Sequence, residues 1–282
     1  MFSFKSISAA VIAATALVAG SYNSISAMTT DKEKGDVIVD LNTSMGNIRV
    51  LLYGDTPRHL ENFVKLVDTG YYDGVLFHRV INDFMVQTGD PTSKNAPKGK
   101  MLGMGDPDYK IEAEFVYPKH FHKRGALAAA REGDSVNPEK KSSGSQFYIV
   151  TGKTFTEGQL DQMDARRIQQ QKQNIFNALV MENRDTIMAL RRDKNQAALQ
   201  QLQNKLIAAT DSAAAAAPDT LTEAQRQAYS TVGGTPHLDG SYTVFGEVIS
   251  GMDVVDKIQK AETDPNDRPL DDISIISAKV VR

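Results

Sequence analysis

Two stretches with the pattern of short β-strands are separated in this chain by a long stretch with the pattern of α-helix. Residues 36–154 and 231–282 hold short runs of β-branched and aromatic residues between connections rich in Gly and Pro. Residues 155–230 are rich in Gln, Ala, Arg and Leu and show no strand pattern. Because strands lie on both sides of this block, the sheet must be completed across it. The block is therefore predicted to be a helical insertion in one β-rich domain.

The β-rich part is predicted to begin with a hairpin and an amphipathic helix. Residues 37–41 and 48–53 are two strand-like runs joined by a turn that contains Gly. Thr56 and Pro57 are expected to be the N-cap and first residue of the helix, which Gly70 ends. Its apolar stripe is Leu60, Phe63, Val64 and Val67. Further strands are expected at 75–81, 84–88, 111–114, 126–130, 145–150, 242–249 and 273–281, with a second short helix at 252–259.

The inserted block has apolar residues at roughly helical spacing, which predicts two or three helices with a narrow apolar stripe. Pro218 indicates a break, after which a last short helix is expected to begin near Thr220 and Thr222. Two interpretations follow from the pattern. The insertion is either a helical hairpin that packs on the rest of the domain or on itself, which the narrow stripe favours, or an arm that holds unfolded client proteins.

The first 27 residues have the pattern of a cleavable signal peptide. Lys5 precedes an uncharged run at 7–20 that is too short to span a bilayer as a helix. Cleavage is expected after Ala27, with Gly20 as a competing site, and residues 28–35 then form a polar leader. A buried N-terminal helix is the alternative, but no amphipathic period runs through the segment. We therefore expect a protein without a membrane span in the periplasm or outside the cell.

Composition and missing motifs exclude several kinds of chemistry. The balance of 32 Lys and Arg against 35 Asp and Glu lacks the basic excess typical of nucleic-acid binding. The chain has no Cys, which removes disulfides and thiolate nucleophiles. The sequence 152–154 resembles the end of a phosphate-binding loop but lacks its first Gly. His120 and His122 form a pair in a Lys-rich loop, which is more typical of a protein surface than of a metal site. No cofactor and no metal are expected.

Residues 77–91 combine an Arg and a Gln with large apolar side chains on neighbouring predicted strands. By strand alternation, Phe77, Arg79 and Ile81 are expected to share one face. An Arg in that setting needs either a ligand or a carboxylate, and a structural ion pair is an equal alternative to a functional role. Residues 143–148 repeat the mixture of an amide with aromatic side chains, and residues 237–240 follow the insertion.

The runs 77–91, 144–149 and 238–246, followed by 251–255, resemble the cyclophilin family of peptidyl-prolyl cis-trans isomerases. The resemblance covers residues 36–154 and 231–282 in the family's order. It implies a mainly β fold, a closed eight-stranded antiparallel barrel capped by two helices, here with the α-helical insertion. It also implies that the enzyme accelerates rotation of X-Pro bonds, with proline-containing unfolded or exported polypeptides as partners.

The resemblance also implies roles for individual residues. Arg79 corresponds to the catalytic arginine, and Gln87 to an amide that orients the substrate or that arginine. The residues implied in substrate binding are Phe84, Met85, Ala130, Gln146, Tyr148, His237, Leu238 and Tyr242. Arg131 stands where Asn is frequent, and the loop 131–143 is longer and more charged than the common version, so peptide preference next to proline is expected to differ. His237 stands where many members carry Trp, a change that is not expected to affect catalysis. A non-catalytic proline-peptide-binding chaperone or scaffold is the alternative, although a mere binder would not need Arg79.

Overall fold

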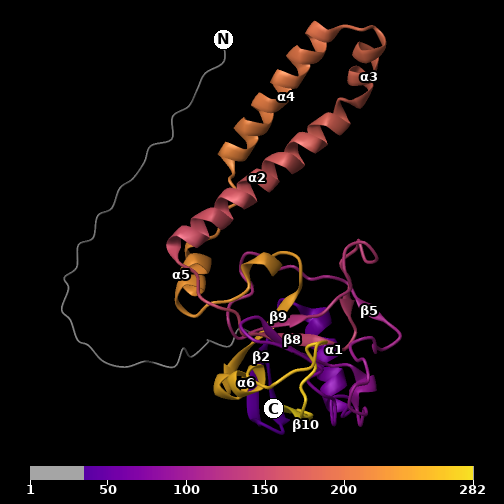
Figure 1. Cartoon of the computed structure of the whole chain (residues 1–282), viewed down its shortest axis with the longest axis vertical. Coiled ribbons are helices and arrows are strands. Elements are labelled where there is room, and N and C mark those ends of the chain that lie inside the picture. The colour runs from indigo at the N-terminus through magenta and orange to yellow at the C-terminus, as the bar shows by residue number, and fades with distance from the viewer. Residues whose placement is uncertain (1–34, 282) are drawn as a thin grey trace, which may run out of the picture. The chain divides into compact units, whose positions relative to one another are not determined.

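The computed structural model describes residues 35–281, and eight antiparallel strands form its main sheet (Figure 1). The expected signal peptide and residues 28–34 of the leader lie outside the described residues. The sheet has the order β10-β1-β2-β9-β6-β8-β4-β3. Its strands are β1 (Val37–Thr43), β2 (Gly46–Leu52), β3 (Arg79–Ile81), β4 (Met85–Thr88), β6 (Ala126–Ala129), β8 (Phe147–Val150), β9 (Val244–Ser250) and β10 (Ile275–Val281). Two short strands, β5 (Lys110–Ile111) and β7 (Ser142–Ser143), form a separate ribbon.

The sheet is a curled half-barrel and not the closed barrel that the resemblance implied, because no ladder joins β3 to β10 within the described residues. β3 is only three residues long, and the backbone N–H of Val80 donates to the carbonyl of Asp267 and not to β10. Phe77 N–H donates to Ile273 O at 2.8 Å, so isolated backbone hydrogen bonds join segments beside the two edge strands without pairing the strands themselves.

The hairpin of β1 and β2 shows how alternation builds the core. Val39 pairs with Val50 and Leu41 with Ile48, and all four side chains are fully buried. The turn requires Gly46, which has φ +133°, and a Cβ there would lie 2.8 Å from a methyl carbon of Val254. The expected hairpin is therefore present, with a tighter turn than the sequence indicated.

Two helices, α1 (Pro57–Asp68) and α6 (Met252–Gln259), pack on the sheet (Figure 1). The expected N-cap of α1 is wrong in one respect, because the Thr56 side chain makes no cap hydrogen bond and donates to Tyr53 O. The carboxylate of Glu114 instead accepts from the backbone N–H groups of Arg58 and His59, at 3.1 and 3.0 Å. A carboxylate distant in the sequence thus accepts hydrogen bonds from N–H groups that have no partner within the first turn of α1.

Four helices occupy the inserted block: α2 (Glu157–Glu182), α3 (Arg184–Arg192), α4 (Gln196–Ala216) and α5 (Glu223–Thr231). Capping boxes begin α2 at Thr156 and α5 at Thr222. α2 and α4 run side by side, and an ion pair of 2.7 Å joins Lys172 on α2 to Asp211 on α4 (Figure 1). Two 3₁₀ turns, Pro91–Ser93 and Pro236–Leu238, lie in loops of the sheet region. Within residues 35–281, no helix is long and apolar enough to cross a bilayer.

The base of the insertion is held by an ionic cluster and a small apolar core. Arg226 on α5 contacts three carboxylates of α2 at 2.6–2.7 Å, those of Glu157, Asp161 and Asp164. Leu160, Leu221 and Tyr229 are buried together, with Phe121 and Phe155 packed against them. Phe121 belongs to the sheet region, so the base of the insertion shares apolar contacts with that region.

Candidate active site

Strands β3 and β4 bring two of the expected site residues side by side. Arg79 pairs directly with Gln87, and Ile81 with Met85, so these side chains share one face of the ribbon. Val80, which faces the other way, is buried in the main core. The register therefore sets a guanidinium and an amide next to each other on the face turned away from that core.

The expectation that Phe77 shares this face is wrong. Phe77 is buried in the main core with Val80, whereas Ile81 packs on a second cluster that includes Met85 and Tyr148. The reason is that β3 begins only at Arg79, so regular alternation does not extend back to residue 77.

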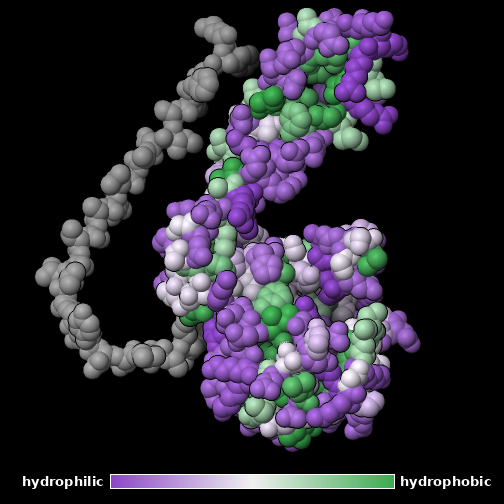
Figure 2. Space-filling model, viewed as in Figure 1, coloured by the Kyte–Doolittle hydropathy of each residue, from purple (hydrophilic) through white to green (hydrophobic). Residues whose placement is uncertain are grey.

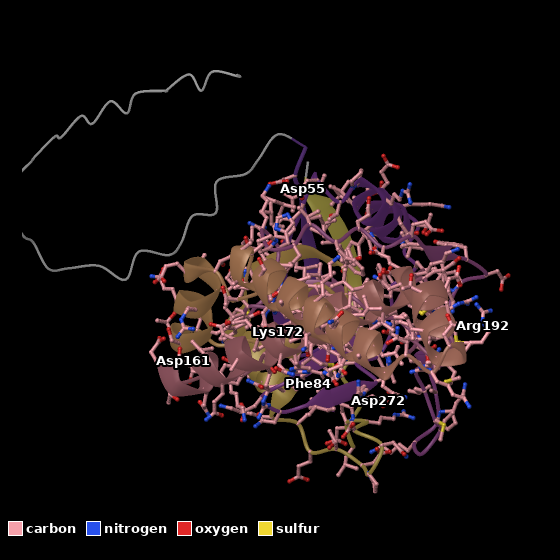
Figure 3. All side chains as sticks on the ribbon, turned by 90° about the horizontal axis from the view of Figure 1, so that it is seen from above. Asp55, Phe84, Asp161, Lys172, Arg192 and Asp272 are labelled. Atoms are coloured by element: carbon pink, nitrogen blue, oxygen red, sulfur yellow. The ribbon has the colours of Figure 1, made fainter. Side chains whose placement is uncertain are left out.

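A pocket of about 290 Å³ lies beside this ribbon, and eight of the ten expected site residues line it. They are Arg79, Phe84, Met85, Gln87, Ala130, Tyr148, Leu238 and Tyr242. Phe84 precedes β4, in the loop that follows β3 (Figure 3). Met85 and Tyr148 are buried and Phe84 is half-buried, so the wall is apolar on one side while Arg79 and Gln87 supply donors on the other.

The two remaining residues, Gln146 and His237, lie next to the pocket without lining it. Gln87 Nε2 donates to Gln146 Oε1 at 3.0 Å, and Gln146 Nε2 donates to the carbonyls of Gly103 and Gly105. Gln146 therefore fixes the orientation of the Gln87 side-chain amide through this hydrogen bond. The His237 ring stacks on Phe84, with 5.6 Å between ring centroids, and lines a neighbouring cavity.

Arg79 has a carboxylate neighbour but no hydrogen bond within the described residues. Its Nε lies 3.6 Å from Asp267 Oδ2, which is an ion-pair distance beyond the range of a hydrogen bond. The side chain is 44% exposed. Within residues 35–281, the guanidinium thus has a carboxylate nearby, as a structural ion pair requires, and its donors have no hydrogen-bond acceptor, as a ligand-binding role requires.

A buried polar network supports the pocket wall through the hydroxyl of Tyr148. The hydroxyl of Tyr148 lies 3.0 Å from Nε2 of His122, whose Nδ1 lies 3.0 Å from Oδ1 of Asp239. Asp239 Oδ2 accepts from the hydroxyl of Tyr229 at 2.7 Å and from Nε2 of Gln225 at 3.1 Å. Tyr229 and Gln225 belong to α5, so the network extends from the pocket into the insertion.

Sequence reasoning missed several residues of the pocket, among them His78 and Asn266. Arg131, noted only as a departure from the family, also lines it, and its guanidinium lies 4.4 Å from the centroid of the Tyr242 ring. The signal for Arg131 was its place directly after Ala130. His78 adjoins Arg79, but a single His beside an Arg carries no pattern that distinguishes a pocket residue.

His78 is neutral at physiological pH. Burial lowers its pKa from 6.5 to about 4, against a smaller opposing effect of the Asp90 carboxylate. The ring therefore adds no positive charge beside Arg79, so the guanidinium is the main cationic group of β3. Within the described residues, no group of three or more His, Asp or Glu side chains could hold a metal ion.

Comparison with known proteins agrees with this architecture. The family model for cyclophilin-type peptidyl-prolyl cis-trans isomerases matches residues 38–211 and 169–280. A Staphylococcus saprophyticus protein that carries the name of a peptidyl-prolyl cis-trans isomerase is 31% identical over 255 residues, which are 90% of this chain and 96% of that protein. A protein of the same name from Staphylococcus aureus is 29% identical over 254 residues, with the same coverage.

Among solved structures, a cyclophilin-type isomerase of Cryptosporidium parvum shares the fold. It superposes with a TM-score of 0.50 at 20% identity and covers 88% of this chain and 98% of its own. The two Staphylococcus proteins each match 90% of this chain, which is more than its β-rich segments alone, so their matches include part of the insertion. Matches over most of the length, together with the strand order and the pocket, establish that the chain belongs to the cyclophilin-type peptidyl-prolyl cis-trans isomerase family.

Proposed function

We propose that this isomerase acts on X-Pro bonds in unfolded segments of exported polypeptides, with Arg79 as its catalytic residue. In this proposal the proline ring enters the pocket walled by Phe84, Met85, Tyr148 and Leu238, near Ala130 and Tyr242. Gln87, held by Gln146, orients the substrate backbone. The observation that carries the proposal is the pairing of Arg79 with Gln87 beside an apolar wall, with the guanidinium donors free.

The physical basis is the electronic change on rotation. An X-Pro amide resists rotation by about 18 to 20 kcal/mol because the nitrogen lone pair is conjugated with the carbonyl. Twisting localises that lone pair on the prolyl nitrogen, so a guanidinium aimed there gains a hydrogen bond that the planar amide cannot accept. The apolar wall disfavours the more polar planar amide. No covalent step is needed.

The decisive experiment replaces Arg79 by Ala. A charge-assisted hydrogen bond contributes about 1.5 to 3 kcal/mol, so Arg79→Ala should lower kcat/KM by about ten- to a hundredfold in proline-limited refolding. The matched control is Arg49→Ala, which removes an exposed arginine that pairs with Asp40 on the hairpin. Full activity of Arg79→Ala, with circular dichroism unchanged in both variants, would overturn the assignment.

Export is proposed from the charged and apolar pattern of residues 5–20. The mature chain should begin after Ala27, which N-terminal sequencing of protein recovered from the periplasm or medium would test. A chain that retains Met1 and stays in the cytoplasm would rule out this location.

A second candidate function is the holding of apolar client segments by the insertion. A groove of about 620 Å³ opens where α2, α3 and α4 meet, and apolar atoms gather there in Figure 2. It includes Phe176, Met181 and Met188, and the two Met side chains are 67% and 59% exposed. Flexible Met side chains on an open surface suit varied apolar partners.

A truncation tests this second function without disturbing the network behind the pocket. Replacing residues 174–209 by a short Gly-Ser turn removes the groove and keeps the Lys172–Asp211 ion pair, α5 and Tyr229. We expect suppression of aggregation to fall, while kcat/KM on a short peptide stays within about twofold. Equal suppression of aggregation by the full and truncated chains would exclude the holding role.

A further inference from the structure

The insertion and the sheet region together line a second cavity, of about 440 Å³, next to the candidate active site. Phe84 lines this cavity as well as the proline pocket, and His237 stacks on Phe84 and lines only the second cavity. Phe155 and Met163 add apolar wall from the start of the insertion. The two cavities therefore adjoin at Phe84, which a peptide with proline in the first pocket would pass to enter the second.

Cations exceed free carboxylates around this cavity. Lys153 and Arg166 line it, both are exposed, and within residues 35–281 neither side chain makes an ion pair or hydrogen bond. Asp83 is the opposing exposed carboxylate. The remaining charged groups are already used: Arg167 pairs with Asp219, and the Asp239 side chain, fully buried, belongs to the network behind the pocket.

Two buried donors at the wall also lack partners. Thr235 Oγ1 and Arg167 Nε have no hydrogen-bond partner in the described part of the chain. Both atoms are shielded from solvent, so a ligand in the cavity would reach them only after these side chains rotated. The selection for an anionic ligand therefore comes from Lys153 and Arg166, the exposed cations that line the cavity.

We propose that this cavity is a specificity subsite that binds an acidic side chain of the substrate, a few residues from the proline. The inference rests on the proposed function, because the same peptide must occupy both cavities. Each extended residue spans at most about 3.6 Å, and the two cavities share one phenyl ring as a wall, so the acidic residue lies about two to four positions away. Lys153 and Arg166 are the residues that recognise it.

The experiment compares peptides that differ by one charge. Peptides with a central Ala-Pro carry Glu, Gln or Lys at each position from the second to the fourth on either side, and isomerisation is followed by NMR exchange. At one or more positions we expect kcat/KM for Glu to exceed that for Lys by about fivefold, with the ratio falling toward one in 1 M salt. Because the ratio is taken within one protein, changes in overall activity cancel.

Charge reversal assigns the preference to the cavity. Lys153→Glu with Arg166→Glu should bring the Glu-to-Lys ratio below one, and the neutral pair Lys153→Gln with Arg166→Gln should bring it near one. The matched control is Arg192→Glu, which changes an exposed arginine at the end of α3 that lies apart from Phe84 in Figure 3. It should leave the ratio unchanged.

Two outcomes separate failure of the subsite from failure of the proposed function. Catalysis of all peptides with equal rates for Glu and Lys, or a ratio that the double reversal does not move, would overturn the subsite alone. Absence of catalysis on every peptide, the Gln series included, would overturn the isomerase function on which the subsite rests.

Discussion

The sheet region and the insertion distribute their apolar side chains in opposite ways. In the sheet region, β1, β2, α1 and α6 close on one core in which Val39, Leu41 and Leu127 are fully buried. In the insertion, α2 runs for 26 residues and buries only Leu160, and α3 buries none. The sheet region is thus stabilised by burial, whereas the insertion is a helical hairpin whose apolar stripe stays largely open.

The two regions derive their stability from different sources. Most helical stability in proteins comes from tertiary packing of an apolar face, so the insertion depends on its attachment, which the Arg226 cluster and the buried Tyr229 provide at one end. The other end keeps an accessible groove. The insertion is thus attached at one end and carries an open groove at the other.

The sharpest test of this contrast compares two Leu→Ala variants. Leu127→Ala removes a fully buried side chain from the sheet core and should lower the free energy of unfolding by about 4 kcal/mol. Leu199→Ala removes a half-buried side chain of α4 and should cost below about 1 kcal/mol. Urea denaturation measures both. Similar losses in the two variants would show that the insertion is packed as tightly as the sheet.

A smaller loss is expected where the two regions join. Asp239→Asn keeps the volume but replaces a buried acceptor that serves His122, Gln225 and Tyr229, so we expect a cost of about 3 kcal/mol and weaker peptide binding through Tyr148. The control is Asp253→Asn, an exposed partner of Lys257, which should change stability by less than 0.5 kcal/mol. If Asp239→Asn left stability and peptide binding unchanged, the two regions would be independent.

The smallest effect is a pH dependence that belongs to the sheet region. His78 is neutral in the folded state because its pKa is about 4, whereas the unfolded chain protonates it near 6.5. Between pH 6.5 and pH 4 the unfolded state therefore binds more protons than the folded state, so the free energy of unfolding decreases as the pH falls below 6.5. At pH 5 this loss is about 2 kcal/mol. Burial also lowers the pKa of His237, which adds in the same direction.

His78→Gln should flatten most of this dependence in urea denaturation at pH 8 and pH 5. The difference between the two pH values is the measured quantity, so a general loss of stability from the substitution does not affect it. An unchanged pH dependence in His78→Gln would assign the effect to other groups.

Much of the fold was predictable because periodicity and caps are local. The helix expected at 252–259 is α6, Met252–Gln259, and the residues Thr222 and Pro57 stand at helix starts as anticipated. The cap of α1 was not predictable, since its Glu114 ligand is more than fifty residues away. The end of regular alternation at Arg79, which sends Phe77 into the main core, likewise depends on where the chain pairs.

The family and eight residues that line the pocket beside β3 and β4 could be predicted from the sequence, because they lie in short runs whose order and spacing are visible along the chain. The folded chain was needed to show that the sheet remains a half-barrel, and that Tyr229 of the insertion is linked through Asp239 and His122 to the pocket wall. It was also needed to show that Lys153 and Arg166 line one cavity. Hydrogen bonds and charge clusters between distant segments depend on distances in space, which no local pattern encodes.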